Sequence, residues 1–142
     1  GLGVREGALI SFFGILNVQS GELEYCLGGH DPPYIIRTSG EIERLPLTDG
    51  MLLGVEEDFR YESRRAVIQK GETIFLYTDG VTEAMNPDDQ LFTDERLEKD
   101  LARWREQDTT TVINSVRESV RNFSEGTPQS DDITMLALKF YG

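Results

Sequence analysis

The segment Thr73–Tyr77 constrains the fold most, because it reads Thr-Ile-Phe-Leu-Tyr and is almost wholly apolar. A short run of this kind without alternating polar residues predicts a strand that is central in its sheet and buried. Asp79 and Gly80 come just after it. The sequence therefore predicts a rigid central strand that holds an acidic side chain at its end.

Upstream of that strand, short apolar runs alternate with turn signals, which is typical of hairpin-connected strands. A Gly-Gly-His-Asp-Pro-Pro segment at residues 28–33 interrupts all regular structure. We expect three antiparallel pairings: Ala8–Val18 with Glu22–Leu27, Tyr34–Arg37 with Glu41–Leu45, and Phe59–Ile68 with Thr73–Tyr77.

Downstream of Asp79 the apolar period becomes helical, and two helices are expected before a final strand at Ile133–Phe140. We expect Thr93 to cap the first helix and Asp108 or Thr109 to cap the second. The residues that mark the two apolar faces are Leu97, Leu101 and Trp104, then Val112, Val116, Val120 and Phe123. The pattern predicts an α+β domain in which two adjacent helices pack on one face of antiparallel β-sheets.

Composition narrows the classes of function. The 142 residues include 14 Lys and Arg against 26 Asp and Glu, a formal net charge of −12, which disfavours binding to nucleic acid or anionic membranes. The sequence contains neither a signal peptide nor an apolar run long enough to span a membrane. Cys26 is the only cysteine, so an internal disulfide is excluded and a reducing cytoplasm is the expected location.

Two acidic motifs lie next to the ends of predicted apolar strands. Asp79 ends the central strand, and Asp131-Asp132 stands before the final one. If the two strands are neighbours, Asp79 and Asp131 converge on one divalent cation, with Asp132 pointing the other way. Each motif alone is more often a turn or a solvated loop, and the single histidine, His30, is better explained as a loop organiser than as a general base.

Several motifs in register resemble the SpoIIE/RsbU-like branch of the PPM-type serine/threonine protein phosphatases, from about Ala8 to the C-terminus. They are Phe12–Leu16, the 28–33 segment, Leu53-Gly54, the Tyr77–Ala84 segment and the Ser130–Thr134 segment. The resemblance implies an αββα sandwich that hydrolyses phosphoserine or phosphothreonine with a binuclear Mn²⁺ or Mg²⁺ centre. It implies that Asp79 and Asp131 are metal ligands and catalytic residues.

The resemblance also implies a substrate, a phosphorylated anti-anti-sigma-type protein in a bacterial partner-switching cascade that regulates sigma factors. The family's first strand, with an aspartate that bridges both metals, is missing from this sequence. We therefore expect residues 1–142 to be the C-terminal portion of the catalytic domain, with weak binding of one ion and little or no turnover on its own. Without the N-terminal elements that cover the sheet in the family, we expect apolar sheet surface to be exposed and to favour a homodimer.

Two other readings stay open at this stage. The Tyr77–Val81 segment superficially resembles the haloacid-dehalogenase-like phosphatases, but Tyr77 stands where their nucleophilic aspartate must be. The chain could also be a non-enzymatic regulatory or interaction module with a phosphatase-like fold.

Overall fold

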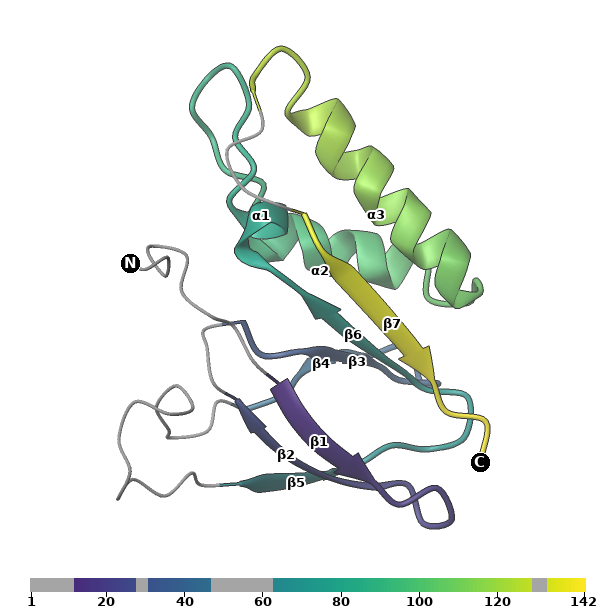
Figure 1. The fold of residues 1–142 in the computed structure, drawn as a ribbon. Helices are drawn as coiled ribbons and strands as arrows, with labels where there is room; N and C mark the ends of the chain where they lie inside the picture. Colours follow the sequence, from purple (N-terminus) through teal and green to yellow (C-terminus); the bar gives the residue numbers. More distant parts are fainter. Residues whose placement is uncertain (1–11, 28–30, 47–62, 129–132) are drawn as a thin grey trace, which may run out of the picture.

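We describe a computed structural model of the chain, which covers residues 12–27, 31–46, 63–128 and 133–142 in detail (Figure 1). The strands are β1 Phe12–Leu16, β2 Glu22–Leu27, β3 Tyr34–Ile36, β4 Ile42–Arg44, β5 Arg64–Val67, β6 Thr73–Tyr77 and β7 Met135–Lys139. The helices are α1 Asp79–Thr82, α2 Thr93–Arg103 and α3 Thr109–Phe123. The predicted α+β class is confirmed.

The strands form two antiparallel sheets. One has the order β1-β2-β5 and the other the order β4-β3-β6-β7. The first two predicted hairpins, β1 with β2 and β3 with β4, are confirmed. Strand β6 lies between β3 and β7 in the second sheet, as the apolar run predicted. The end of β6 therefore has a neighbouring strand on each side.

The third predicted pairing is wrong. Strand β5 pairs with β2 in the first sheet, whereas β6 belongs to the second, so residues 69–72 carry the chain from one sheet to the other. Gly71 takes a positive φ of 90°, as in a hairpin turn, but Glu72 is buried and does not lie at an exposed tip. Turn-forming residues in a short connection were compatible with both paths, and burial of Glu72 accompanies the crossover.

The two sheets and the helices make three layers with two cores (Figure 1). Side chains alternate along the strands, so Phe75 and Tyr77 of β6 face the helices while Ile74 faces the other sheet. Both faces of β3 are filled in the same way, by Tyr34 and Ile35. Covering both faces explains why these strands lack the polar alternation of an exposed sheet.

Helices α2 and α3 bury the apolar faces that the sequence predicted, but only one predicted cap is confirmed. Asp108 caps α3, because its side chain accepts a hydrogen bond of 2.8 Å from the Thr111 amide. Thr93 does not cap α2: it is the first helical residue with a φ of 75°, and Phe92 precedes it without a side-chain cap. Phe92 packs instead in the core, so burial of this aromatic ring sets the start of α2.

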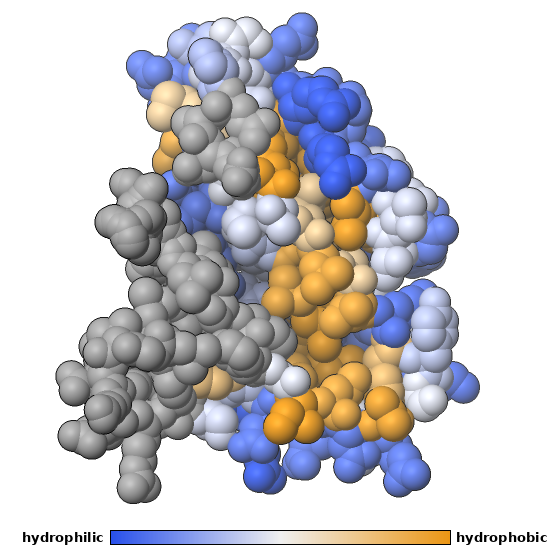
Figure 2. Space-filling view, in the orientation of Figure 1, coloured by the Kyte–Doolittle hydropathy of each residue, from blue (hydrophilic) through white to orange (hydrophobic). Residues whose placement is uncertain are grey.

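Strand β7 is an edge strand whose outward apolar side chains are only partly covered. Leu136 and Leu138 are 51% and 52% exposed. Figure 2 shows an apolar strip on this face of the molecule, and a groove of about 390 Å³ between the two sheets is lined by Leu16, Ile74, Leu138 and Phe140. The opening of the sandwich between β1 and β7 is thus apolar.

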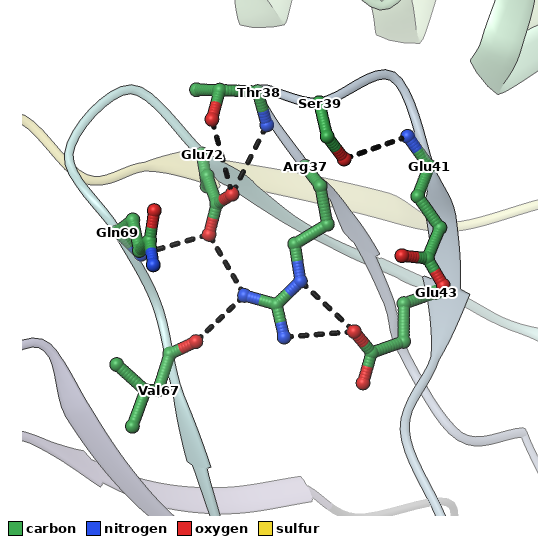
Figure 3. A network of polar contacts seen from close by, with 8 residues as sticks. All are labelled: Arg37, Thr38, Ser39, Glu41, Glu43, Val67, Gln69 and Glu72. Atoms are coloured by element: carbon green, nitrogen blue, oxygen red, sulfur yellow. Dashed lines mark hydrogen bonds and ion pairs between the residues drawn. The ribbon is translucent and has the colours of Figure 1, made fainter.

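A network of charged side chains joins the two sheets where the chain crosses between them (Figure 3). Arg37 Nη1 donates two hydrogen bonds, one of 2.8 Å to the Glu72 carboxylate and one of 2.6 Å to the Val67 carbonyl. The Arg37 guanidinium also forms an ion pair with Glu43 at 2.8 Å. The Glu72 carboxylate also accepts from the backbone amides of Gln69 and Thr38. The carboxylate is thereby compensated by several donors, which a charge so deeply buried requires.

These contacts set the ionisation of Glu72. Burial alone would raise its pKa, but the hydrogen bonds from Gln69, Arg37 and Thr38, together with the charge of Arg37, outweigh burial and lower it. A lowered pKa in the folded state means that ionised Glu72 contributes stability above its ordinary titration range. That contribution is lost as the pH falls through the folded-state pKa.

We predict that Glu72→Gln lowers the free energy of unfolding by about 2–4 kcal/mol at pH 7, because Arg37 loses its buried carboxylate partner. Urea unfolding at pH 7 and at pH 3 measures the effect, and the difference between the proteins should shrink in acid. Glu41→Gln is the matched control, since Glu41 is exposed and no side-chain contact of it is seen in Figure 3. Equal unfolding midpoints for Glu72→Gln and Glu41→Gln at pH 7 would contradict the prediction.

Candidate functional site

The candidate site lies at the end of β6, where the buried strand gives way to the short helix α1. Asp79 is the first residue of α1 and is partly exposed, while Gly80 and Val81 after it are buried. The Asp79 carbonyl accepts a 2.8 Å hydrogen bond from the Glu83 amide, which closes the turn. The strand on one side and this turn on the other fix the backbone that carries the Asp79 carboxylate.

Strands β6 and β7 are neighbours, which was the condition for Asp79 and Asp131 to converge. Beyond the last strand pair, the Thr78 amide donates to the Thr134 carbonyl at 3.1 Å, and the Thr134 amide donates to Thr78 Oγ1 at 3.1 Å. The chain leading into β7 therefore lies beside Thr78 and the start of α1. Asp131 and Asp132 lie outside the residues that the structure describes, so the role of Asp131 stays a prediction.

A second carboxylate, Asp31, lies against Asp79, and the sequence reasoning missed it. Asp31 precedes two buried prolines and strand β3, which runs antiparallel to β6, so the start of β3 lies beside the end of β6. The Asp31 side chain is hydrogen-bonded to that of Asp79. Asp31 could have been identified in the sequence from its position three residues before β3, but only if the pairing of β3 with β6 were already known.

The environment of Asp31 disfavours its negative charge. Burial raises its pKa to about 7, and the hydrogen bond with Asp79 and the charges of Asp79, Asp94 and Glu83 act in the same direction. The Oδ2 atom of Asp31 is buried and has no hydrogen-bond partner within the described part of the chain. Among the described residues, no ion pair to Lys or Arg involves Asp31 or Asp79.

Two acidic side chains of α2, Asp94 and Glu98, have polar partners. Asp94 pairs with Arg44 at 3.1 Å, and Glu98 accepts a 2.6 Å hydrogen bond from the Tyr34 hydroxyl. The Arg44 guanidinium also lies over the Tyr34 ring, 5.6 Å from its centroid. Unlike Asp94, the Asp31–Asp79 pair has no Lys or Arg partner among the described residues, and its oxygen donors suit a hard divalent cation.

The described part of the chain does not hold a complete metal site. It contains no group of three or more His, Cys, Asp or Glu side chains arranged to bind an ion. It also contains no helix long and apolar enough to cross a membrane. The described residues place two carboxylates together here, Asp31 before β3 and Asp79 after β6.

Comparison with known protein families gives a match over nearly the whole chain. Residues 7–141 match the family model described as Stage II sporulation protein E (SpoIIE). The chain belongs to the SpoIIE family. The predicted resemblance to the SpoIIE/RsbU-like branch of the PPM-type phosphatases is confirmed, and the family supports a protein phosphatase role.

Two curated relatives agree with this family. Protein IcfG of Synechocystis is 32% identical over 128 residues, which are 89% of this chain and 20% of IcfG. The phosphoserine phosphatase RsbU of Bacillus subtilis is 25% identical over 134 residues, which are 90% of this chain and 38% of RsbU. The chain thus spans only a minor part of each of these relatives.

Solved structures agree on the fold. The phosphatase domain of SpoIIE from Bacillus subtilis, in crystals presoaked with Mn, superposes with a TM-score of 0.70. Its sequence is 15% identical, and the match covers 92% of this chain and 56% of that one. At this identity the likeness establishes the shared arrangement of sheets and helices.

We predict that Asp31→Asn stabilises the metal-free protein at pH 8 by about 1–3 kcal/mol and has a smaller effect at pH 5. The folded protein keeps Asp31 protonated up to about pH 7, whereas the unfolded chain releases that proton near pH 4. Wild type therefore loses stability between these values as the pH rises, and the neutral asparagine does not.

Urea unfolding in EDTA from pH 5 to pH 8 measures this difference. Asp88→Asn is the control, because Asp88 is exposed and lies in the turn between α1 and α2. Stability curves of wild type and Asp31→Asn that stay parallel across this range would show that Asp31 does not titrate near neutral pH.

Proposed function

We propose that the chain is the C-terminal portion of a metal-dependent phosphatase domain that hydrolyses phosphoserine or phosphothreonine in a regulatory protein. The observation that carries the proposal is the Asp31–Asp79 pair at the end of β6, in a chain that belongs to the SpoIIE family. Two adjacent carboxylates to which the described residues give no basic partner are suited to a divalent cation and poorly suited to binding a phosphate directly.

Asp79 and Asp131 are the proposed metal ligands, for Mn²⁺ or Mg²⁺. The residues present fit such an ion. Asp31 Oδ2 is buried without a partner among the residues that the structure describes, and a cation beside Asp79 would counter the burial and the carboxylate charges that raise the pKa of Asp31. Bound divalent ions supply an activated water and screen charge on the phosphoryl oxygens.

The protein's own part is to hold Asp79 in place and to provide ligands rather than a nucleophile. Strand β6 fixes the Asp79 backbone between two neighbouring strands. Cys26 lies in β2, in the other sheet, and so is not part of this site. A water-based hydrolysis needs no cysteine nucleophile, which agrees with the residues found here.

The proposed substrate is a phosphorylated anti-anti-sigma-type protein in a partner-switching cascade that controls a sigma factor. This proposal is supported by the relationship to RsbU, a phosphoserine phosphatase, and by the family resemblance. We also propose a cytoplasmic location, in keeping with the single cysteine, Cys26. The net charge of −12 agrees with a protein substrate and disfavours nucleic acid.

We predict that the 142-residue chain binds one Mn²⁺ weakly and that Asp79→Asn and Asp131→Asn each abolish measurable binding, because each removes a charged oxygen ligand. Isothermal titration with Mn²⁺ measures the affinity, and release of phosphate from a phosphoserine peptide measures turnover, which should be low. Asp88→Asn is the control and should bind as wild type does. Unchanged Mn²⁺ affinity in both ligand variants would remove these residues from the site.

We also propose that the chain self-associates through the open edge of β7. This strand carries a single charge, Lys139, and no proline, so little protects its edge from pairing. In an antiparallel pair centred on Ala137, Lys139 of one copy would face Met135 of the other, and the exposed leucines would meet without like-charge repulsion.

Light scattering after size-exclusion chromatography tests the self-association. We expect a dimer for wild type and a shift towards monomer for Leu138→Lys, because a charge on the pairing surface is costly to bury. Val67→Lys is the control, since Val67 is also exposed (53%) but lies on β5, in the other sheet. A wild-type monomer at high concentration would refute the dimer.

A further inference from the structure

A pocket of about 560 Å³ opens next to the candidate site. One wall is formed by α1 and the residues after it, beginning at Gly80, which follows Asp79 directly. The other wall is the C-terminal half of α3 and the turn after it, including Arg117 and Arg121. The pocket therefore begins at Gly80, one residue after the candidate metal ligand, and continues along the surface of α3.

The two walls are held together by aromatic packing. Phe92, before α2, meets Phe123 at the end of α3 edge to face, with 5.5 Å between ring centroids. The Arg96 guanidinium covers the Phe123 ring at 4.6 Å from its centroid. The first wall is tied down at the same place, because the Phe92 amide donates to the Ala84 carbonyl at 2.8 Å. The pocket is thus formed between elements that are fixed relative to each other.

Two arginines give the α3 wall a positive charge. Arg117 and Arg121 lie one helical turn apart, and both are exposed beside the buried Val116 and Val120. Arg121 contacts Glu118 at 3.3 Å in a pair more than half exposed on each side, which contributes little. Arg117 donates to Asn114 Oδ1 at 3.0 Å, and the described residues give it no carboxylate partner.

We propose that this pocket binds the peptide segment beside the phosphorylated residue of the substrate protein and that an acidic side chain of that segment pairs with Arg117 and Arg121. The proposal rests on the proposed function, because the phosphorylated residue would lie at Asp79. In a protein of net charge −12, an acidic segment is repelled over much of the surface. Arg117, which bonds to the neutral Asn114, and Arg121, whose pair with Glu118 is solvent-exposed, give such a segment a favourable place beside the site.

The opposite wall limits where that acidic side chain fits. Glu83 belongs to the wall nearest Asp79, and Glu125 lies in the turn after α3. The negative charges of Glu83 and Glu125 repel an acidic side chain of the substrate segment near them. Such a side chain is therefore favoured along the α3 wall, beside the arginines. The pocket therefore selects the position of a charge within the substrate segment, which gives a register and not only a general attraction.

Fluorescence anisotropy with labelled phosphoserine peptides tests this on the 142-residue chain in the presence of Mn²⁺. One peptide carries glutamate beside the phosphoserine and the other carries lysine at the same positions. We expect Arg117→Glu to weaken binding of the glutamate peptide about fivefold or more and to strengthen binding of the lysine peptide. Arg105→Glu, an exposed arginine outside the pocket, is the matched charge control and should reproduce neither effect.

The outcomes separate this inference from the proposed function. If Arg117→Glu and Arg105→Glu change both affinities equally, the pocket does not bind the segment and the inference is overturned. The unphosphorylated glutamate peptide tests the other point: if it binds as tightly as the phosphorylated one, the proposed phosphate site fails. In that case a selective charge reversal at Arg117 would still support the pocket as the place where the acidic segment binds.

Discussion

Burial of β6 on both faces is the constraint on which the rest of the structure depends. Its side chains alternate between the core under the helices and the core between the sheets, and its backbone pairs with β3 on one side and β7 on the other. A strand that is packed on both faces and paired on both edges cannot shift its register without exposing apolar side chains of one face or the other. Because Asp79 comes two residues after the end of this strand, its backbone is held in a fixed position.

The sequence was sufficient to locate most strands and helices but not to decide how the sheets are assembled. The apolar run of β6 and the helical spacing of Leu97 and Leu101 were local signals, and the structure confirms both elements. The crossover at residues 69–72 was misjudged as a hairpin, because the contact that accompanies it joins Glu72 to Arg37, 35 positions away. Local turn chemistry carries no information about a partner so distant in the sequence.

The same limitation explains what could be predicted of the candidate site. Asp79 was found because its strand and the following glycine are adjacent in the sequence. Asp31 was missed because its importance comes from strand pairing that brings the start of β3 beside the end of β6. The cap expected at Thr93 failed for a comparable reason, since burial of Phe92 in the core, and not the local capping preference, sets where α2 begins.

The two ends of β6 place acidic side chains in opposite electrostatic environments. At its start, Glu72 is surrounded by donors and its pKa is lowered. At its end, burial and the contact with Asp79 raise the pKa of Asp31. Among the described residues, Asp31 Oδ2 is a carboxylate oxygen buried without a hydrogen-bond partner, and such an oxygen costs stability. Carboxylate oxygens suit a divalent cation, so the proposed metal role would account for this cost in stability.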